Sequence, residues 1–250
     1  MNDTVALVTG AARGIGLATA ALFHAEGRRV VMLDRDAEEL AKAAATLPGA
    51  LPITCDVSIP QEVAQSIAEV EQTCGRLDIL VNNAGVADFG PLAETDFDRW
   101  RRVMATNLDG VFLMSQACLP LLSVRGGAIV NIGSISGLRA STLRIAYGTS
   151  KAAIIHLTKQ QAAELGEVGI RANCVCPGPV NTKLALAVHS PEIRAAYHDA
   201  IPLNRYGSER EIAEVICFLA SERASYVTGQ VVASDGGFDA TGVGLPALRG

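Results

Sequence analysis

Several features of specialised proteins are scarce or missing in this 250-residue chain. Basic residues are not in excess, since 21 Lys and Arg stand against 26 Asp and Glu, a formal net charge of −5. A nucleic-acid-binding protein normally carries a basic excess or stripe, so we expect no nucleic-acid partner. No run reaches the roughly 18 apolar residues of a membrane span, and the first residues lack the pattern of a signal peptide. We therefore expect a cytoplasmic protein without membrane contact.

Cysteine motifs are missing as well. The six cysteines form no CxxC pair, and none has a histidine at zinc-ligand spacing. Free cysteines in apolar surroundings pack as small hydrophobic residues. We therefore expect reduced, buried thiols and no metal site. The six positions are Cys55, Cys74, Cys118, Cys174, Cys176 and Cys217.

What the chain does contain is apolar residues, at 49% of the sequence, with 19% charged residues. This composition excludes global disorder, and a chain of this length can bury a sizeable core. No linker rich in Pro, Gly or Ser divides it. We therefore expect a single domain over residues 1–250.

Short apolar runs alternate with helical segments along the whole chain. Apolar strands that alternate with helices indicate a parallel sheet covered on both faces, that is, a doubly wound α/β domain. The expected strands are Thr4–Thr9, Arg29–Leu33, Ala50–Thr54, Leu77–Asn82, Gly127–Ile132, Ile170–Val175 and Gln230–Ala233. The expected helices are Gly14–Gly27, Asp36–Leu47, Pro60–Cys74 (with Ser58 as N-cap), Thr95–Ser123 (one or two helices), Tyr147–Glu167 and Ser208–Ser221.

A glycine-rich turn joins the first strand to the first helix. Its glycines are Gly10, Gly14 and Gly16, in the spacing Gly-x-x-x-Gly-x-Gly. Glycines permit a tight turn and let backbone N–H groups approach a pyrophosphate at a helix N-terminus. The alternative is a turn that merely packs the helix on the strand. The strand–turn–helix context favours a dinucleotide site.

Asp34 ends the second strand, where a carboxylate can accept hydrogen bonds from both ribose hydroxyls of an adenosine. It would repel a 2′-phosphate, so we expect NAD rather than NADP, although the neighbouring Arg35 could bind that phosphate. Alternatively, Asp34 caps the following helix. After the third strand, Asp56 and Val57 are expected to contact the adenine, on weaker grounds, because a loop Asp is usually a turn residue.

Tyr147 and Lys151 lie four residues apart near the start of a predicted helix, so they share one face. A free phenol is protonated at neutral pH, and a neighbouring ammonium group favours the phenolate that could act as a base. Ser134 lies 13 residues before Tyr147 and could hold a substrate oxygen. In isolation the pair is better explained as an exposed helix face. Only its combination with Ser134 and the glycine-rich turn favours catalysis.

Together these motifs resemble the short-chain dehydrogenase/reductase family, from Thr9 to Gly237. The resemblance implies a seven-stranded parallel sheet. Its motifs are the turn Thr9–Gly16, Asn82-Asn83-Ala84-Gly85, the four residues Asn107, Ser134, Tyr147 and Lys151, the loop Pro177-Gly178 with Thr182, and Asp235-Gly236-Gly237. Gly133 departs from the second Ser that many relatives carry, but the spacing from Ser134 to Tyr147 is kept.

The resemblance also implies the roles of individual residues. Tyr147 is the expected general acid/base, Lys151 assists it and binds the nicotinamide ribose, and Ser134 orients the substrate oxygen. The Asn107 backbone is expected to hold a water that links Lys151 to solvent. The expected cofactor-binding residues are Gly10, Arg13, Gly14, Ile15, Gly16, Asp34, Arg35, Asp56, Val57, Asn83, Ala84, Gly85, Tyr147, Lys151, Pro177, Gly178, Val180 and Thr182.

The expected activity is reversible hydride transfer between NAD(H) and a secondary alcohol/ketone pair, with a small polyol or sugar as substrate ahead of a hydroxy acid or cyclic alcohol. The alternatives are an NADPH-dependent 3-oxoacyl-carrier reductase and a dinucleotide-binding protein without turnover. The expected substrate pocket comprises Ser136, Leu138, Arg139, Ser141, Leu143, Asn181, Leu184 and His189.

Three further expectations concern the periphery of the domain. Residues 182–202 interrupt the strand–helix rhythm and are expected to form a substrate lid. Residues 238–250 run past the usual end of the family and form either a frayed terminus or an arm that reaches a neighbouring subunit. The family resemblance also implies a homotetramer of two-fold symmetry, in which long helices pair between subunits.

Overall fold

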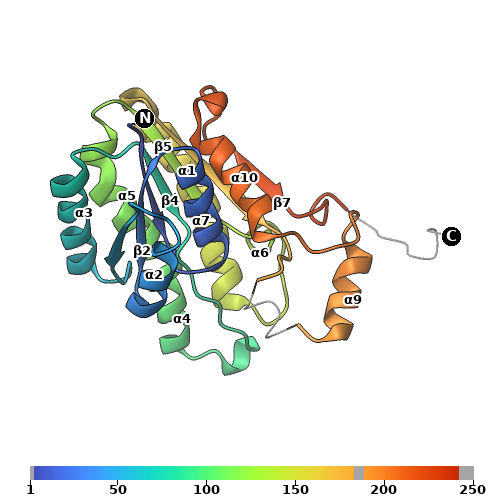
Figure 1. Ribbon diagram of the computed structural model, residues 1–250. Helices are drawn as coiled ribbons and strands as arrows, with labels where there is room; N and C mark the ends of the chain where they lie inside the picture. Colours follow the sequence, from blue (N-terminus) through green and yellow to red (C-terminus); the bar gives the residue numbers. More distant parts are fainter. Residues whose placement is uncertain (1–2, 183–188, 242–250) are drawn as a thin grey trace.

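The computed structural model describes residues 3–182 and 189–241. They form one sheet of seven parallel strands in the order β3-β2-β1-β4-β5-β6-β7 (Figure 1). The doubly wound, seven-stranded parallel sheet expected from the sequence is thus confirmed. The strands are β1 Val5–Thr9, β2 Arg29–Asp34, β3 Leu51–Thr54, β4 Ile79–Asn82, β5 Gly127–Ile132, β6 Ile170–Pro177 and β7 Val231–Ser234.

Two apolar cores lie on opposite faces of the sheet. Alternate strand residues point to opposite faces, so Val8 and Met32 join one core while Leu7 and Leu33 join the other. Helices α1, α2 and α10 cover the first face, and α3, α5 and α7 cover the second (Figure 1). These helices are α1 Gly14–Ala25, α2 Ala37–Ala44, α3 Pro60–Cys74, α5 Gly110–Leu122, α7 Ile145–Leu165 and α10 Glu209–Ala220.

The strand order reverses between β1 and β4, which are neighbours in the sheet but not in sequence. From β1 the chain continues to β2 and β3 on one side, while β5, β6 and β7 follow β4 on the other. In such sheets the loops at the carboxyl ends separate at the reversal and leave a crevice for a ligand. The candidate site is therefore expected above β1 and β4.

The segment predicted as one or two helices over Thr95–Ser123 is two helices joined by a π turn. α4 covers Phe97–Met104, the π turn covers Ala105–Asp109, and α5 follows directly. A π turn places one extra residue in the helical path and is frequent at functional sites. Here the extra residue falls beside Asn107, one of the predicted site residues.

Two predicted helix starts were wrong in detail. Ser58 does not cap α3, because Ile59 occupies the N-cap position without a side-chain hydrogen bond. Ser58 instead donates from its backbone N–H and its hydroxyl to Asp56 Oδ1, at 2.9 and 2.6 Å. α2 is shorter than expected and is capped by Asp36, which accepts a hydrogen bond from the Glu39 N–H at 3.2 Å.

A buried polar network attaches α7 to the centre of the sheet. Asn131 of β5 donates to Thr158 Oγ1 at 2.9 Å and to Gln161 Oε1 at 2.7 Å, both on α7. The side-chain Oδ1 of Asn131 accepts from the Asn82 side chain of β4 at 2.9 Å, and Gln161 donates to Ser115 of α5 at 2.9 Å. Buried polar groups need such partners, so the network fixes the position of α7 relative to β4 and β5.

Outside this framework lie the peripheral segments. Helix α9, Pro191–Ala200, lies within the region 182–202 that was expected to be a lid, while residues 183–188, including Leu184, lie outside the described residues. Of the 238–250 tail, only residues 238–241 are described.

Five of the six cysteines are buried and Cys74 is half-buried. Burial raises the pKa of the Cys217 thiol to about 12. None of the described helices is long and apolar enough to cross a membrane.

Candidate active site

The glycine-rich turn after β1 leaves room for backbone alone. Gly10 has a φ of +64°, and a Cβ placed there would lie 2.9 Å from the Ala84 Cα. A Cβ on Gly16 would lie 2.1 Å from the Gly10 carbonyl oxygen. Any side chain at either position would therefore collide with the backbone. The turn leads directly into the N-terminus of α1, where N–H groups without intrahelical partners favour an anion.

Asn83, at the carboxyl end of β4, holds this turn in place. Its side-chain amide donates to the carbonyl oxygens of Thr9 and Gly10, at 2.9 and 3.1 Å. In return, Thr9 Oγ1 accepts hydrogen bonds from the Asn83 and Ala84 N–H groups, each at 3.0 Å. The two loops at the strand-order reversal are thus tied to each other, and the direct role of the Asn83 side chain is to position the turn.

Asp34 ends β2 beside the turn and is half-buried. Its carboxylate accepts hydrogen bonds from the Ala12 and Asp36 N–H groups, each at 3.1 Å. Asp34 is therefore not the cap of α2, a role that Asp36 takes. Asp36 also forms an ion pair with Arg13 of the turn. Asp34 is held facing the turn by backbone donors and forms no ion pair within the described residues.

Asp56 follows β3, the edge strand beside β2. Its carboxylate lies 3.7 Å from the Arg35 Nη1 atom. Partial burial raises the pKa of Asp56, but hydrogen bonds from Ser58 and the charge of Arg35 outweigh it, so the pKa is below its ordinary value. The adjacent Val57 is buried, and its side chain packs so closely on α5 that a Cβ on Gly110 would lie 2.7 Å from it.

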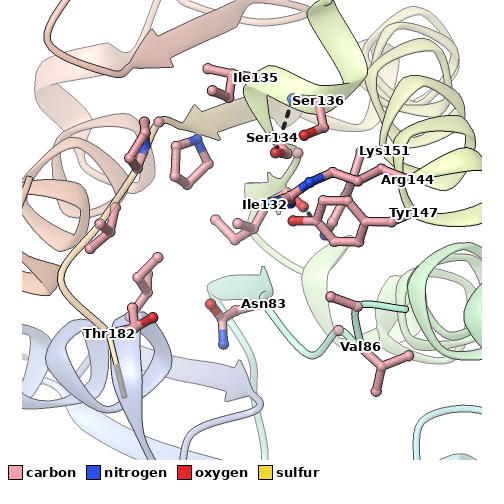
Figure 2. Close-up of a pocket in the computed structure, with 18 of the residues that line it drawn as sticks. Asn83, Val86, Ile132, Ser134, Ile135, Ser136, Arg144, Tyr147, Lys151 and Thr182 are labelled. Carbon is pink, nitrogen blue, oxygen red and sulfur yellow. Dashed lines mark hydrogen bonds between the residues drawn. The ribbon is translucent and has the colours of Figure 1, made fainter. Parts of the chain in front are cut away.

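The side chains of Ser134, Tyr147 and Lys151 line the same pocket (Figure 2). The Lys151 Nζ atom is buried, donates to the Ile132 carbonyl oxygen at 2.8 Å and lies 5.7 Å from the centroid of the Tyr147 ring. Ser134 follows β5 and caps the short helix α6, Ile135–Leu138. Its Oγ accepts from the Ser136 N–H at 3.1 Å, which fixes its rotamer.

Asn107 lies in the π turn, beside this group. Its Oδ1 accepts from the Val86 N–H at 2.8 Å, and its Nδ2 donates to the Val86 carbonyl oxygen at 2.9 Å and to Ser150 Oγ at 3.0 Å. A Cβ on Gly85 would lie 3.3 Å from Asn107 Oδ1 and 3.5 Å from Lys151 Nζ. The side chain of Asn107 therefore fastens the 85–86 loop to α7. The backbone of Gly85 lies between Asn107 and Lys151.

The loop after β6 forms the opposite wall. Gly178 accepts no side chain, because a Cβ there would lie 2.6 Å from the Asp235 Cα. Val180 pairs with Gly207 in an isolated bridge, and Thr182 donates its N–H to the Val180 carbonyl oxygen at 2.8 Å. Figure 2 shows Thr182 across the pocket from Tyr147, with Asn83 between them along the floor. These contacts hold the loop against β7 and Gly207 where it faces the Tyr147 side.

One cavity of about 240 Å³ joins these walls. It contacts expected cofactor residues and expected catalytic residues together, which is the arrangement that a two-substrate reaction needs. Its described lining consists of Ile15, Asn83, Gly85, Val86, Ala87, Phe89, Ile132, Gly133, Ser134, Ile135, Ser136, Arg144, Tyr147, Lys151, Pro177, Gly178, Pro179, Val180, Thr182, His189 and Tyr197.

Of the residues expected to bind substrate, Ser136 and His189 line this cavity. Leu138, Arg139, Ser141, Leu143 and Asn181 are not among the lining residues.

Their contacts explain the difference. The Leu143 side chain is 54% exposed, while Arg139 donates to the Phe238 carbonyl oxygen at 2.6 Å. Asn181 accepts from Arg194 at 2.9 Å, and Ser141 lies 3.2 Å from Ser136 Oγ.

The sequence reasoning missed Arg144, Phe89 and Tyr197, which do line the cavity. Arg144 occupies the N-cap position of α7, and its guanidinium lies 5.8 Å from the centroid of the Tyr147 ring. Its place three residues before Tyr147 was the available signal, because residues three apart on a helix are neighbours. Phe89 lies in the loop after β4 and Tyr197 lies in α9. Neither segment shows a hydrophobic periodicity in the sequence that would place its side chains at the cavity.

The residues present fit a dinucleotide. The turn before α1 provides a cradle that Cβ atoms on Gly10 or Gly16 would fill, and Asp34 faces that turn. Residues 3–182 and 189–241 contain no group of three His, Cys, Asp or Glu side chains placed to hold a metal ion.

Comparisons with known proteins agree with this geometry. A family model described as enoyl-(acyl carrier protein) reductase matches residues 10–239. The chain is 39% identical to 2-(S)-hydroxypropyl-CoM dehydrogenase 3 of Xanthobacter autotrophicus, over 96% of this chain and 98% of that protein. It is 40% identical to the 3-oxoacyl-acyl-carrier-protein reductase FabG of Thermotoga maritima, over 95% of this chain and 98% of that protein.

A solved structure gives the same result. The crystal structure of gox2181 matches with a TM-score of 0.93 and 34% sequence identity, covering 96% of this chain and 97% of that one. The two relatives and this structure each match nearly the full length of the chain. The chain therefore belongs to the short-chain dehydrogenase/reductase family, whose members are oxidoreductases that use a nicotinamide cofactor.

Proposed function

We propose that the protein transfers a hydride reversibly between NAD(H) and a secondary alcohol/ketone pair. The observation that carries this proposal is the single cavity that contacts Ile15 at the glycine-rich turn and also Ser134, Tyr147 and Lys151. Cofactor and substrate can therefore meet there. A bound nicotinamide supplies the hydride acceptor or donor, and the side chains of the chain handle the proton.

Tyr147 is the proposed general acid/base. In alcohol oxidation its phenolate takes the hydroxyl proton, and in ketone reduction its phenol returns a proton to the oxygen. The buried ammonium group of Lys151 lies 5.7 Å from the ring centroid, which places it to assist Tyr147 in the proton transfer. Ser134, held by the Ser136 N–H, donates a hydrogen bond to the substrate oxygen and orients it.

Proton exchange with solvent is proposed to run from Lys151 past Asn107. Hydrogen bonds in a π turn run from residue i to residue i+5, so the backbone near Asn107 departs from the regular helical pattern. A carbonyl oxygen there can hold a water beside Lys151. The Asn107 side chain fastens the neighbouring loop and supports this arrangement.

Selection of NAD over NADP is proposed to rest on Asp34. Its carboxylate faces the turn, held by the Ala12 N–H, where it can accept from both adenosine ribose hydroxyls and would repel a 2′-phosphate. Arg35, which could attract that phosphate, lies 3.7 Å from Asp56 and is partly neutralised by it. For the other cofactor-binding residues named in the sequence analysis, we propose the same contacts with the cofactor that the family resemblance implies.

The test is an initial-rate assay with NAD⁺ and with NADP⁺, over sugars, polyols, hydroxy acids and cyclic alcohols at mildly alkaline pH. The proposal expects NAD⁺-dependent oxidation of one class. NADP⁺ preference would overturn the account of Asp34. Absence of turnover with both cofactors, together with tight NADH binding, would favour a binding protein without catalysis.

A second candidate is an NADPH-dependent 3-oxoacyl-carrier reductase, which the similarity to FabG favours. Arg13 and Arg35 flank Asp34 and could hold a 2′-phosphate if their carboxylate partners released them. The same assay, run in the reducing direction with a 3-oxoacyl thioester, distinguishes the two. NADPH-dependent reduction of that thioester, in preference to NADH, would select the second candidate.

We also propose that the protein is a homotetramer. Two large apolar residues on the helices α4 and α5 are exposed, Phe97 of α4 at 70% and Phe112 of α5 at 50%. Apolar surface that is buried between subunits would account for both. A light-scattering mass of four chains would support the proposal, and a monomer mass near 26.1 kDa would refute it.

A further inference from the structure

The cavity carries more positive charge than its proposed chemistry needs. Its described lining includes the cationic side chains of Arg144 and Lys151, and it includes no Asp or Glu. Lys151 is committed to the Ile132 carbonyl oxygen and to Tyr147. Neither hydride transfer nor the proton path uses Arg144. The guanidinium of Arg144 lies beside the proposed general base but has no role in the proposed reaction, so its presence there needs a separate explanation.

The guanidinium of Arg144 is held by rings instead of by a carboxylate. Its central carbon lies 4.6 Å from the centroid of the Phe89 ring and 5.8 Å from that of Tyr147. In the described residues no carboxylate forms an ion pair with it. Arg99 and Arg102, by contrast, both pair with Asp88. Figure 2 shows the Arg144 side chain extending across the Tyr147 ring toward the middle of the pocket.

The neighbouring loop fixes this arrangement. The Phe89 carbonyl oxygen accepts a hydrogen bond from Arg99 Nη2 at 2.9 Å. The next residue, Gly90, donates its N–H to the Leu143 carbonyl oxygen at 3.0 Å and forms an isolated bridge with Arg144. The ring under the guanidinium is thereby tied to the chain segment that carries the guanidinium. Stacking leaves the N–H edge of a guanidinium free to donate to an anion.

A second guanidinium adds to the positive potential. Arg194 of α9 stacks on Tyr206 at 4.5 Å, donates to Asn181 Oδ1 at 2.9 Å, and has a buried Nη1 without a hydrogen-bond partner. Burial and the charges of Arg144 and Arg194 lower the pKa of His189, which also lines the cavity. His189 is therefore neutral at neutral pH and cannot neutralise an anion itself.

We propose that Arg144 is a specificity-determining residue that binds an anionic oxygen group of the substrate, so that the preferred substrates are small secondary alcohols or ketones bearing a carboxylate or sulfonate. This inference rests on the proposed function and narrows it. The guanidinium carbon of Arg144 lies 5.8 Å from the centroid of the Tyr147 ring. The anionic group of the substrate is therefore expected within a few bonds of the carbon that exchanges the hydride. A hydroxy acid therefore moves ahead of a neutral polyol.

The test uses a complex that cannot turn over, namely the enzyme with NADH and an alcohol. 3-Hydroxybutyrate and its neutral amide, 3-hydroxybutyramide, are titrated into this complex, and into the enzyme alone, by calorimetry. Hydrogen bonds to charged groups contribute about tenfold or more to binding, so the wild-type complex should bind the acid at least about tenfold more tightly than the amide. Ethanesulfonate, titrated likewise, separates recognition of charge from recognition of a carboxylate.

The variants assign the preference to one residue. Arg144→Met should remove the preference for the acid while leaving amide affinity within about threefold, since only the charged contact is lost. Arg144→Lys should keep part of the preference. Arg101→Met, on the exposed surface of α4, is the matched control and should keep all of it. Thermal unfolding of each variant confirms that it folds.

The outcomes separate the inference from the proposed function. Equal wild-type affinity for the acid and the amide would overturn the inference, and so would an Arg144→Met variant that loses both ligands alike or keeps the preference. The initial-rate assay decides the proposed function independently. A protein that prefers the acid but shows no turnover on any alcohol keeps the anion site and loses the dehydrogenase assignment.

Discussion

The two sides of the candidate site differ in the kind of group that forms them. The cofactor side is the glycine-rich turn, where Gly10 and Gly16 are packed so closely that a Cβ would lie 2.9 and 2.1 Å from neighbouring atoms. The substrate side consists of side chains from separate loops and helices, among them Phe89, Arg144 and His189.

This difference explains what each side reveals in the sequence. A backbone site demands glycine at fixed spacing and is therefore recognisable. A side-chain site can change residue by residue on the same fold, so it leaves no fixed pattern.

The largest expected effect is on the rate of the reaction, and it tests whether Tyr147 serves catalysis without contributing to NADH binding. Tyr147→Phe should lower kcat by about a thousandfold, because general acid/base catalysis contributes on that order, while NADH affinity stays within a few fold. Tyr226→Phe, at a fully exposed position, is the control and should change neither quantity. If Tyr147→Phe retained most of the rate, another group would have to move the proton.

The next effect tests the backbone site. Gly16→Ala should lower the free energy of unfolding by about 3 kcal/mol, as overpacking does, and should weaken NADH binding, because the added methyl group meets the Gly10 carbonyl at 2.1 Å. Gly166→Ala is the matched control, since nothing lies within 4 Å of its added Cβ. Chemical denaturation and NADH titration measure both. Equal behaviour of the two variants would contradict the close-packed cradle.

A third effect, of intermediate size, concerns the choice of cofactor. Asp34→Ala should reduce the preference for NAD⁺ over NADP⁺ by about tenfold or more, the contribution of a hydrogen bond to a charged group. It removes the acceptor for the ribose hydroxyls and the repulsion of a 2′-phosphate. Glu38→Ala, on the exposed face of α2, should leave the ratio of kcat/KM values unchanged. An unchanged ratio in Asp34→Ala would show that selectivity lies elsewhere.

The smallest effect is a dependence on pH at the substrate side. Burial and the charges of Arg144 and Arg194 hold the pKa of His189 below its ordinary value. In the unfolded chain the histidine protonates near about pH 6.5, so below that pH the unfolded state binds more protons. Stability should therefore fall as pH drops from neutral through the lowered pKa.

His189→Gln should lose less stability than wild type over this range, and Arg144→Met should raise the pKa of His189 in an NMR titration. A pKa of His189 above about 6.5 in the wild type would contradict the placement of the two guanidiniums.

The fold was predictable because its strands are apolar throughout and its helices follow at regular intervals. The expectation of seven parallel strands came from family resemblance and the structure confirms it, while the order of the strands is a finding of the structure. Details of local geometry were not predictable: Ser58 bonds to Asp56 instead of capping α3, and the π turn at Asn107 has no sequence signature.

At the site, the same distinction holds. Ser134, Tyr147 and Lys151 were brought together as the spacing suggested. Leu143 was expected at the pocket, yet it contributes a backbone carbonyl to Gly90 and leaves its side chain exposed. Arg144, its neighbour, turns inward instead. Which of two adjacent loop residues faces a cavity depends on tertiary contacts that no period in the sequence encodes.

The most direct test of the central claim is a single-turnover experiment. Enzyme loaded with NAD⁺ is mixed with the fastest alcohol of the panel, in normal form and deuterated at the carbinol carbon, and formation of NADH is followed in time. The account predicts stoichiometric NADH formation that is slowed by deuterium, because the hydride crosses within the cavity that contains Tyr147. Formation of NADPH alone from NADP⁺, or no reduced cofactor although both ligands bind, would contradict it.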